Sequence, residues 1–149
     1  MTGTLSFEYE YSRDDDDDFG KLTAEVRTPS FSGRNRMWVQ WQDVVDLAAA
    51  LATFPIEADD PVTAEWGFGG SDPSQAVTTT ITKVSIAPQG RTGGLIVRVA
   101  LTDQHDASDR CSTHFTTDYP SIERFGDEIT IMMRDRTGRA VLHGRVDDR

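Results

Sequence analysis

The chain has 149 residues, which fits one domain, 1–149. It is 37% hydrophobic and 27% charged, a composition that indicates a globular protein and excludes a largely disordered one. No apolar run approaches the ~20 residues of a membrane helix. The N-terminal MTGTLSFEYEYSRD lacks a basic start followed by an apolar stretch, so it predicts no secretory leader.

The net charge of −10 is concentrated in the first part of the chain. Residues 1–60 hold 13 acidic and 5 basic residues, a charge of −8, which leaves −2 for residues 61–149. A field of this sign repels nucleic acid and anionic lipid, and it speeds encounter with basic proteins. We therefore expect a basic protein as the partner, and neither nucleic acid nor a membrane. A net charge of this size is also explained by solubility alone, without any partner.

Three strands are expected before the first helix. FEYEY (7–11) alternates aromatic and acidic side chains, and KLTAEVRT (21–28) alternates again. The aspartate run between them predicts the apex of a hairpin. A third strand is expected within 30–41, and LAAALATF then shows helical spacing, which predicts a helix over 42–54 ended by Pro55.

The rest of the chain is expected to hold four strands and a second helix. The strands fall at 62–69, 76–88, 95–103 and 110–118, and the helix at 120–135, with AVLHGRV (140–146) compatible with a short closing strand. The parity of apolar residues changes between Ile81 and Val84, which predicts a β-bulge near Thr82 or Lys83. The elements predict an α+β fold: an antiparallel sheet of about six to seven strands with two amphipathic helices packed on one face.

Metal sites are not indicated by the acidic clusters. No frame of the aspartate run gives the glycine at the sixth and the glutamate at the twelfth position of a calcium loop. The loop DQHDASD offers Asp103, His105, Asp106 and Asp109, but it lacks the paired cysteines or histidines of zinc sites. We expect polar turns in both places and no metal.

Catalytic patterns are not found in the sequence either. There is no GxSxG elbow, and the glycine loops GFGGSDP and QGRTGG match neither the dinucleotide nor the P-loop pattern. Cys111 and His114 lie three residues apart on a predicted strand, so they point to opposite faces. The lone cysteine also fits a reducing cytoplasm. We expect no catalytic residue and no cofactor, which favours binding over catalysis.

The expected binding surface combines acids with an indole. A tryptophan exposed beside carboxylates is a typical hot spot of a protein interface. Either of two tryptophans would supply the apolar anchor and the acids would supply the negative face. The candidate partner-binding residues are Glu8, Glu10, Asp14, Asp15, Asp16, Asp17, Asp18, Trp38 and Trp66.

The stretch from FSG to LATFP resembles a pattern in small bacterial proteins, some of which look like immunity proteins of toxin systems. The residues that carry the resemblance are Phe31, Gly33, Trp38, Asp43, Leu47, Leu51 and Phe54, within about 25 of the 149 residues. The resemblance implies a binding role and no catalytic group. The expected function is therefore an immunity-type inhibitor of a basic toxin or effector domain.

Two alternatives stay open at this point. The chain could be an acidic mimic of nucleic acid that inhibits a DNA-binding enzyme, which requires carboxylates spaced like phosphates over one surface. It could also be a small-molecule module or enzyme with a pocket between sheet and helices near Trp66 and His114. The oligomeric state is not indicated by any pattern in the sequence.

Overall fold

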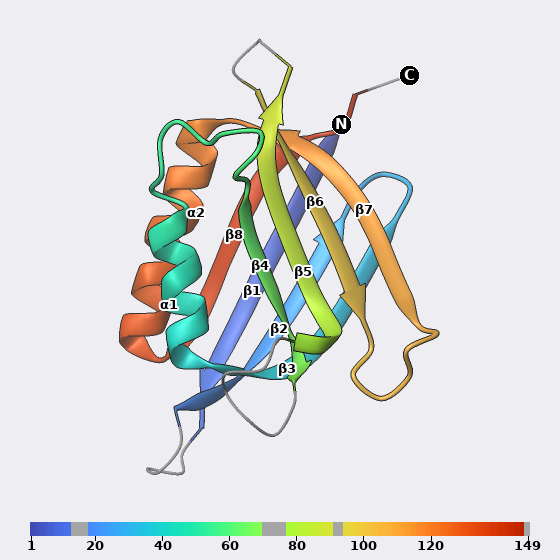
Figure 1. The fold of residues 1–149 in the computed structure, drawn as a ribbon, viewed down its shortest axis with the longest axis vertical. Helices are drawn as coiled ribbons and strands as arrows, with labels where there is room; N and C mark the ends of the chain where they lie inside the picture. The colour runs from blue at the N-terminus through green and yellow to red at the C-terminus, as the bar shows by residue number, and fades with distance from the viewer. Residues whose placement is uncertain (13–17, 70–76, 91–93, 148–149) are drawn as a thin grey trace.

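The computed structural model describes residues 1–12, 18–69, 77–90 and 94–147, in which eight strands and two helices form (Figure 1). In chain order they are β1 (Thr2–Tyr11), β2 (Phe19–Arg27), β3 (Ser32–Gln40), α1 (Trp41–Ala50), β4 (Val62–Gly69), β5 (Val77–Gln89), β6 (Gly94–Thr102), β7 (Arg110–Thr117), α2 (Tyr119–Asp135) and β8 (Thr137–Arg145). The α+β class and the antiparallel sheet are confirmed. Neither helix is long and apolar enough to cross a membrane, within the described ranges.

The sheet has eight strands in the order β3-β2-β1-β8-β7-β6-β5-β4, so the prediction of about six to seven was too low. The strand that corrects it is β8, which lies in the middle of the sheet beside β1. Its sequence TGRAVLHGR places only Ala140 and Leu142 in the core. Two inward aliphatic side chains among glycines and polar residues give a weak alternation, which is why the pattern underestimates this strand.

Alternation along the other strands correctly predicts the core. Phe7 and Tyr9 of β1 are buried, as are the inward residues Leu22, Ala24 and Val26 of β2. The apolar face of α2 is buried in the same cluster, together with two residues of α1. Burial of this continuous apolar surface is the main stabilising contribution to the fold.

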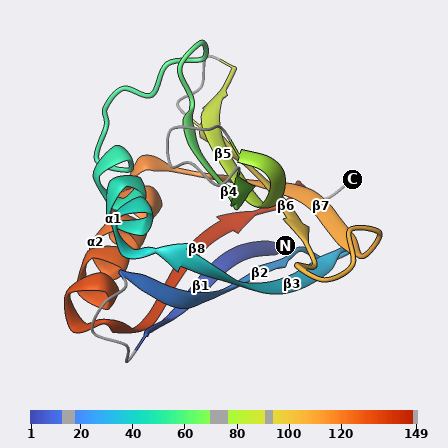
Figure 2. The same cartoon turned by 60° about the horizontal axis from the view of Figure 1, so that its bottom comes forward.

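The eight strands form two half-sheets that meet at a narrow seam. We call β3-β2-β1-β8 the first half-sheet and β7-β6-β5-β4 the second half-sheet. Only Thr116 and Arg145 are paired between β7 and β8. Two threonine hydroxyls of β7 add hydrogen bonds to β8. Thr116 Oγ1 donates to the Arg145 carbonyl at 3.1 Å, and Thr117 Oγ1 donates to the His143 carbonyl at 2.8 Å. In Figure 2, β4 and β5 lie above β1, β2 and β3, so the sheet turns back over itself.

A buried amide joins the two half-sheets across the core. Asn35 of β3 is 5% exposed, and its Nδ2 donates to Ile81 O at 3.0 Å, Thr82 Oγ1 at 3.0 Å and Thr102 O at 3.1 Å. The Thr82 hydroxyl in turn donates to Met37 Sδ at 3.4 Å. These contacts connect β3, at one end of the strand order, to β5 and β6 of the second half-sheet.

The predicted bulge lies at Ile81, one residue before the expected position. The ladder pairs Trp66 with Thr82 and Gly67 with Thr80, so Ile81 has no partner residue on β4. Because of the bulge, the two consecutive residues Ile81 and Thr82 are both buried, with 2% and 0% of their surface exposed. A bulge leaves backbone groups outside the ladder, and here the Ile81 carbonyl is satisfied by the Asn35 amide.

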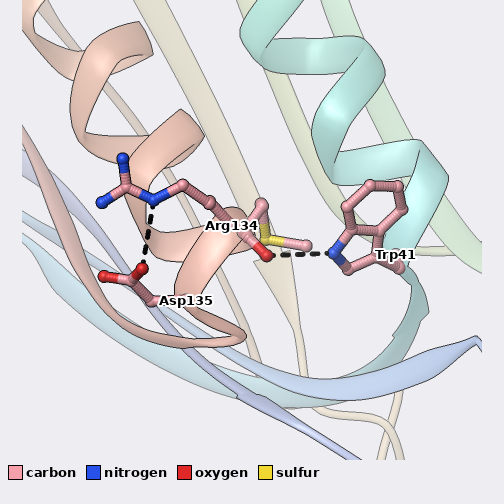
Figure 3. A network of polar contacts seen from close by, with 4 residues as sticks. Trp41, Arg134 and Asp135 are labelled. Carbon is pink, nitrogen blue, oxygen red and sulfur yellow. Dashed lines mark hydrogen bonds and ion pairs between the residues drawn. The ribbon is translucent and has the colours of Figure 1, made fainter.

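The helices lie side by side on one side of the molecule (Figure 1). The Trp41 indole at the start of α1 donates from Nε1 to the Met133 carbonyl of α2 at 3.1 Å (Figure 3). A Cβ atom at Gly126 would be 3.4 Å from Leu51, an ordinary van der Waals contact, so this glycine of α2 faces the C-terminal end of α1. The adjacent exposed residues Arg134 and Asp135 form an ion pair, Nε to Oδ1 at 3.2 Å, which contributes little to stability because water screens it. This pair is drawn in Figure 3.

Helix α1 ends earlier than the predicted range of 42–54. It stops at Ala50 with Leu51 as its C-cap, and Phe54 is 76% exposed. A residue that precedes proline disfavours helical backbone, so Phe54 before Pro55 cannot extend the helix. Helix α2 begins one residue before its predicted start, where Asp118 Oδ1 accepts from the Ser121 N–H at 2.9 Å.

Replacing Asn35 by alanine should lower the free energy of unfolding by about 1 to 3 kcal/mol, because it removes the buried Nδ2 group that donates to β5 and β6. Urea denaturation followed by circular dichroism measures the change. Gln42→Ala is the matched control, since its amide bonds to Asp46 at 2.8 Å in exposed surroundings and its loss should cost under about 0.5 kcal/mol. Equal losses in the two variants would contradict the role of Asn35.

Candidate functional site

The outward side chains of the first half-sheet form a charged surface, which we call the outer face. The alternation that buries Phe7 and Leu22 directs their neighbours to the opposite side of the strands. The strand register then sets these polar residues next to one another. The charged and aromatic members of the outer face are Glu8, Glu10, Phe19, Lys21, Glu25, Arg27, Arg34, Arg36, Trp38, Arg139 and Arg145.

One row of side chains crosses all four strands of the outer face. Arg139 of β8 is opposite Glu8 of β1, Glu8 is opposite Thr23 of β2, and Thr23 is opposite Arg36 of β3. Directly opposed residues on antiparallel strands have Cβ atoms about 4.5 to 5.5 Å apart. The row therefore places a carboxylate between two guanidinium groups.

A second row ends in the exposed indole. Glu10 is opposite Lys21, and Lys21 is opposite Trp38. Lys21 Nζ lies 5.8 Å from the centroid of the Trp38 ring, a cation–π distance. Trp38 is 54% exposed, so much of a large apolar side chain faces solvent beside charged groups.

Two shallow depressions hollow the outer face. The larger is about 460 Å³ in volume and is lined by side chains that include Lys21, Arg34, Arg36 and Arg139. The smaller is about 260 Å³ and includes Arg27. Both are lined by the same four residues, Glu8, Thr23, Arg34 and Arg139. Because they share these side chains, the two depressions adjoin.

Bases outnumber acids on the outer face, which differs from the negative face expected around Glu8 and Glu10. The charged residues that line its two depressions are five bases, Lys21, Arg27, Arg34, Arg36 and Arg139, and three acids, Glu8, Glu10 and Glu25. The local charge is therefore +2 in a chain of net charge −10. Sequence alone could not reveal this surface, because the cross-strand register brings these residues together.

Only one of these cations is in a close ion pair among the described residues. Arg27 Nε lies 3.0 Å from Glu25 Oε1. Within the same part of the chain, Arg34, Arg36 and Arg139 have no carboxylate oxygen within 4.0 Å. Guanidinium groups favour planar, two-oxygen acceptors such as carboxylate and phosphate. The face is thus chemically suited to bind an acidic group.

The aspartate run lies largely outside the described residues. Asp14, Asp15, Asp16 and Asp17 belong to the segment 13–17, for which no structure is given. Asp18 is described and exposed: its Oδ1 accepts from the Tyr11 hydroxyl at 3.2 Å, and its carbonyl accepts from the Trp41 N–H at 2.6 Å. Asp18 therefore connects the ends of β1 and β2 with the start of α1.

The two candidate tryptophans have different environments. Trp38 is on the outer face, whereas Trp66 is only 8% exposed and its ring centroid lies 5.9 Å from that of Phe7. Trp66 therefore packs in the core, and Trp38 is the indole that the surface offers to a partner.

Local hydrogen bonds account for the other polar candidates. Asp103 Oδ2 accepts from the N–H groups of His105 and Asp106 at 2.9 Å, as expected of a polar turn. No cluster of three or more metal-ligating side chains occurs among the residues with a described position. Cys111 is partly buried and His114 is exposed, consistent with the opposite faces predicted from their spacing.

Comparison with known proteins finds no matching protein family, no matching curated protein and no matching solved structure. The candidate site therefore rests on its geometry: a hollowed surface of mixed charge beside one exposed indole. This arrangement can hold a charged macromolecular surface by ion pairs at several points while the indole buries apolar area.

The Tyr9 hydroxyl is buried at the edge of this region and has no hydrogen-bond partner among the residues whose positions are described. Burial raises the pKa of Tyr9 to about 12, with the nearby Tyr11 and Asp18 adding to the rise and Arg136 opposing it. The unfolded chain releases the Tyr9 proton near the ordinary pKa of 10, whereas the folded chain keeps it up to about pH 12. The part of the folding free energy that depends on this proton is therefore fully present below pH 10 and is lost as the pH rises from 10 towards 12.

Tyr9→Phe should therefore lose less stability in alkali than the wild-type chain. At about pH 8 the variant should be at least as stable, because it removes a buried polar atom that has no partner. Urea denaturation at about pH 8 and about pH 11 measures the difference. Parallel decreases in the two proteins would contradict the assignment of this transition to Tyr9.

Proposed function

We propose that this chain is a non-enzymatic binding protein of the immunity type, which covers a protein partner with its outer face. The observation that carries the proposal is the exposed indole of Trp38 in line with Lys21 and Glu10. Indoles supply much of the binding free energy at protein interfaces, because they bury a large area and lose little side-chain entropy. The charges around Trp38 supply orientation and specificity.

Long-range and close-range electrostatics have different parts in this proposal. At long range the net charge of −10 attracts a basic partner and raises the association rate. On contact, Glu8 and Glu10 pair with basic side chains of the partner, whereas the neighbouring arginines pair with acidic side chains. A partner that is basic overall but carries an acidic strip at the contact would satisfy both conditions.

The alternative of a nucleic-acid mimic has less support. It requires regularly spaced carboxylates over one surface, whereas bases interrupt Glu8, Glu10 and Glu25 on the outer face. A small-molecule function near Trp66 has one observation in its favour, a depression of about 340 Å³ between α1 and β4 that includes Trp66 in its lining. It has less support than the binding role, because the indole is only 8% exposed and His114 does not line that depression.

Trp38→Ala should abolish capture of the partner from a lysate of the source organism at low salt. Immobilised wild-type chain and variant are compared by mass spectrometry of the bound proteins. The matched control is Phe54→Ala, since Phe54 is a more exposed aromatic residue (76%) on the loop after α1. Retention of the same proteins by Trp38→Ala and by the wild-type chain would refute Trp38 as the anchor.

Replacing Asp14–Asp18 by asparagine should slow association with the captured partner and leave dissociation nearly unchanged, because steering acts before contact. Surface plasmon resonance at several salt concentrations measures both rates. The wild-type association rate should decrease with salt, and the variant should show a weaker dependence. An association rate that is indifferent to salt would contradict steering.

A further inference from the structure

We infer that the two adjoining depressions of the outer face form one groove that binds an extended acidic polypeptide segment. We call it the arginine groove. Its cationic residues are Lys21, Arg27, Arg34, Arg36 and Arg139. The inference rests on the proposed function in one respect, since it specifies the chemistry that the partner presents at this face.

The dimensions of the groove match an extended chain. The depressions of about 460 and 260 Å³ share Arg34 and Arg139, so a ligand can pass from one to the other. Along β2 the cations run from Lys21 to Arg27. At ~3.3 Å per residue this distance is roughly 20 Å, the length of six to seven extended residues.

The spacing of the arginines matches the repeat of such a chain. Arg34 and Arg36 are two residues apart on β3 and both are exposed. Side chains two apart on a strand lie on one face, about 6.6 Å from each other. Acidic residues at alternate positions of a bound segment have the same repeat, so each carboxylate can meet one guanidinium group.

The cations of the groove are largely uncommitted within the described chain. Arg34, Arg36 and Arg139 have no carboxylate oxygen within 4.0 Å there, although the chain holds 25 acidic residues. Within the described part of the chain, a ligand would therefore not have to displace an ion pair from them. Arg98 provides a contrast, because it is exposed on β6 of the second half-sheet and lines neither depression.

Acids within the groove favour a polypeptide over a nucleic acid. Glu8 and Glu10 line the larger depression and Glu25 the smaller one. A polynucleotide carries a phosphate at every step, so some phosphates would lie against these carboxylates. A polypeptide can place acids opposite the arginines and neutral or basic residues opposite the glutamates.

The test is a titration of the ¹⁵N-labelled full chain with a blocked peptide of alternating glutamate and threonine, followed by NMR at low salt. We expect shifts of β2, β3 and β8 amides. The double variant Arg34→Gln/Arg36→Gln should weaken binding about fivefold to tenfold, as expected for the loss of two exposed charge pairs. Arg98→Gln, the matched control, should bind like the wild-type chain.

Two further probes test the choice of ligand. A peptide of the same composition with its glutamates in one block should bind more weakly, because its acids do not follow the arginine repeat. An oligothymidylate of equal charge should also bind more weakly. Tighter binding of the oligonucleotide, an equal effect of Arg98→Gln, or the lack of any shift in β2 and β3 would overturn the inference.

The outcomes separate this inference from the proposed function. If the peptide fails to bind while Trp38→Ala still abolishes partner capture, the arginine groove is wrong and the binding role stands. If the peptide binds through Arg34 and Arg36 while Trp38→Ala captures the same proteins as the wild-type chain, the groove stands and the indole anchor is wrong.

Discussion

The amide of Asn35 is the contact on which the arrangement of the two half-sheets depends. The bulge at Ile81 removes a carbonyl from the β4–β5 ladder, and the Asn35 Nδ2 group donates to it from β3. The same amide reaches Thr102 of β6, so one side chain connects three strands. A buried donor without an acceptor costs free energy, so the half-sheets are favoured in the relative position that pairs the Asn35 Nδ2 group, although Asn35 Oδ1 has no partner among the described residues.

This arrangement has a direct effect on the outer face. The inner faces of the half-sheets and the helices share the core, so the opposite side of the first half-sheet faces solvent. Cross-strand register then gathers five bases and three acids from four strands in the two depressions, and Trp38 lies opposite one of these bases, Lys21. The local charge of this surface is therefore opposite in sign to that of the whole chain. A partner at a distance is exposed to the negative field of the whole chain, and a partner in contact meets mainly positive side chains.

Much of the fold, but less of the site, could be predicted from the sequence. Period-two alternation correctly predicts the buried residues of β1, β2 and β6, and the helical spacing correctly predicts the apolar face of α2. Strand β8 was underestimated because its inward residues are few. The arginines of the outer face could not be grouped, because Arg34, Arg36 and Arg139 are far apart in sequence and only the pairing of β3, β2, β1 and β8 unites them. Exposure of Trp38 follows from parity with Met37 and Val39, but burial of Trp66 depends on contacts with Phe7 across the core.

The seam between β7 and β8 has a mechanical consequence. A continuous ladder transmits bending from strand to strand through many backbone hydrogen bonds, but here a single residue pair and two threonine hydroxyls span the junction. Gly3 and Gly144 lie against Phe115 at this place, where a side chain on either glycine would collide with the ring. The Phe115 ring therefore limits how closely the two half-sheets approach each other at the seam. A smaller side chain at this buried position would leave a cavity between the half-sheets at the place where few backbone hydrogen bonds join them.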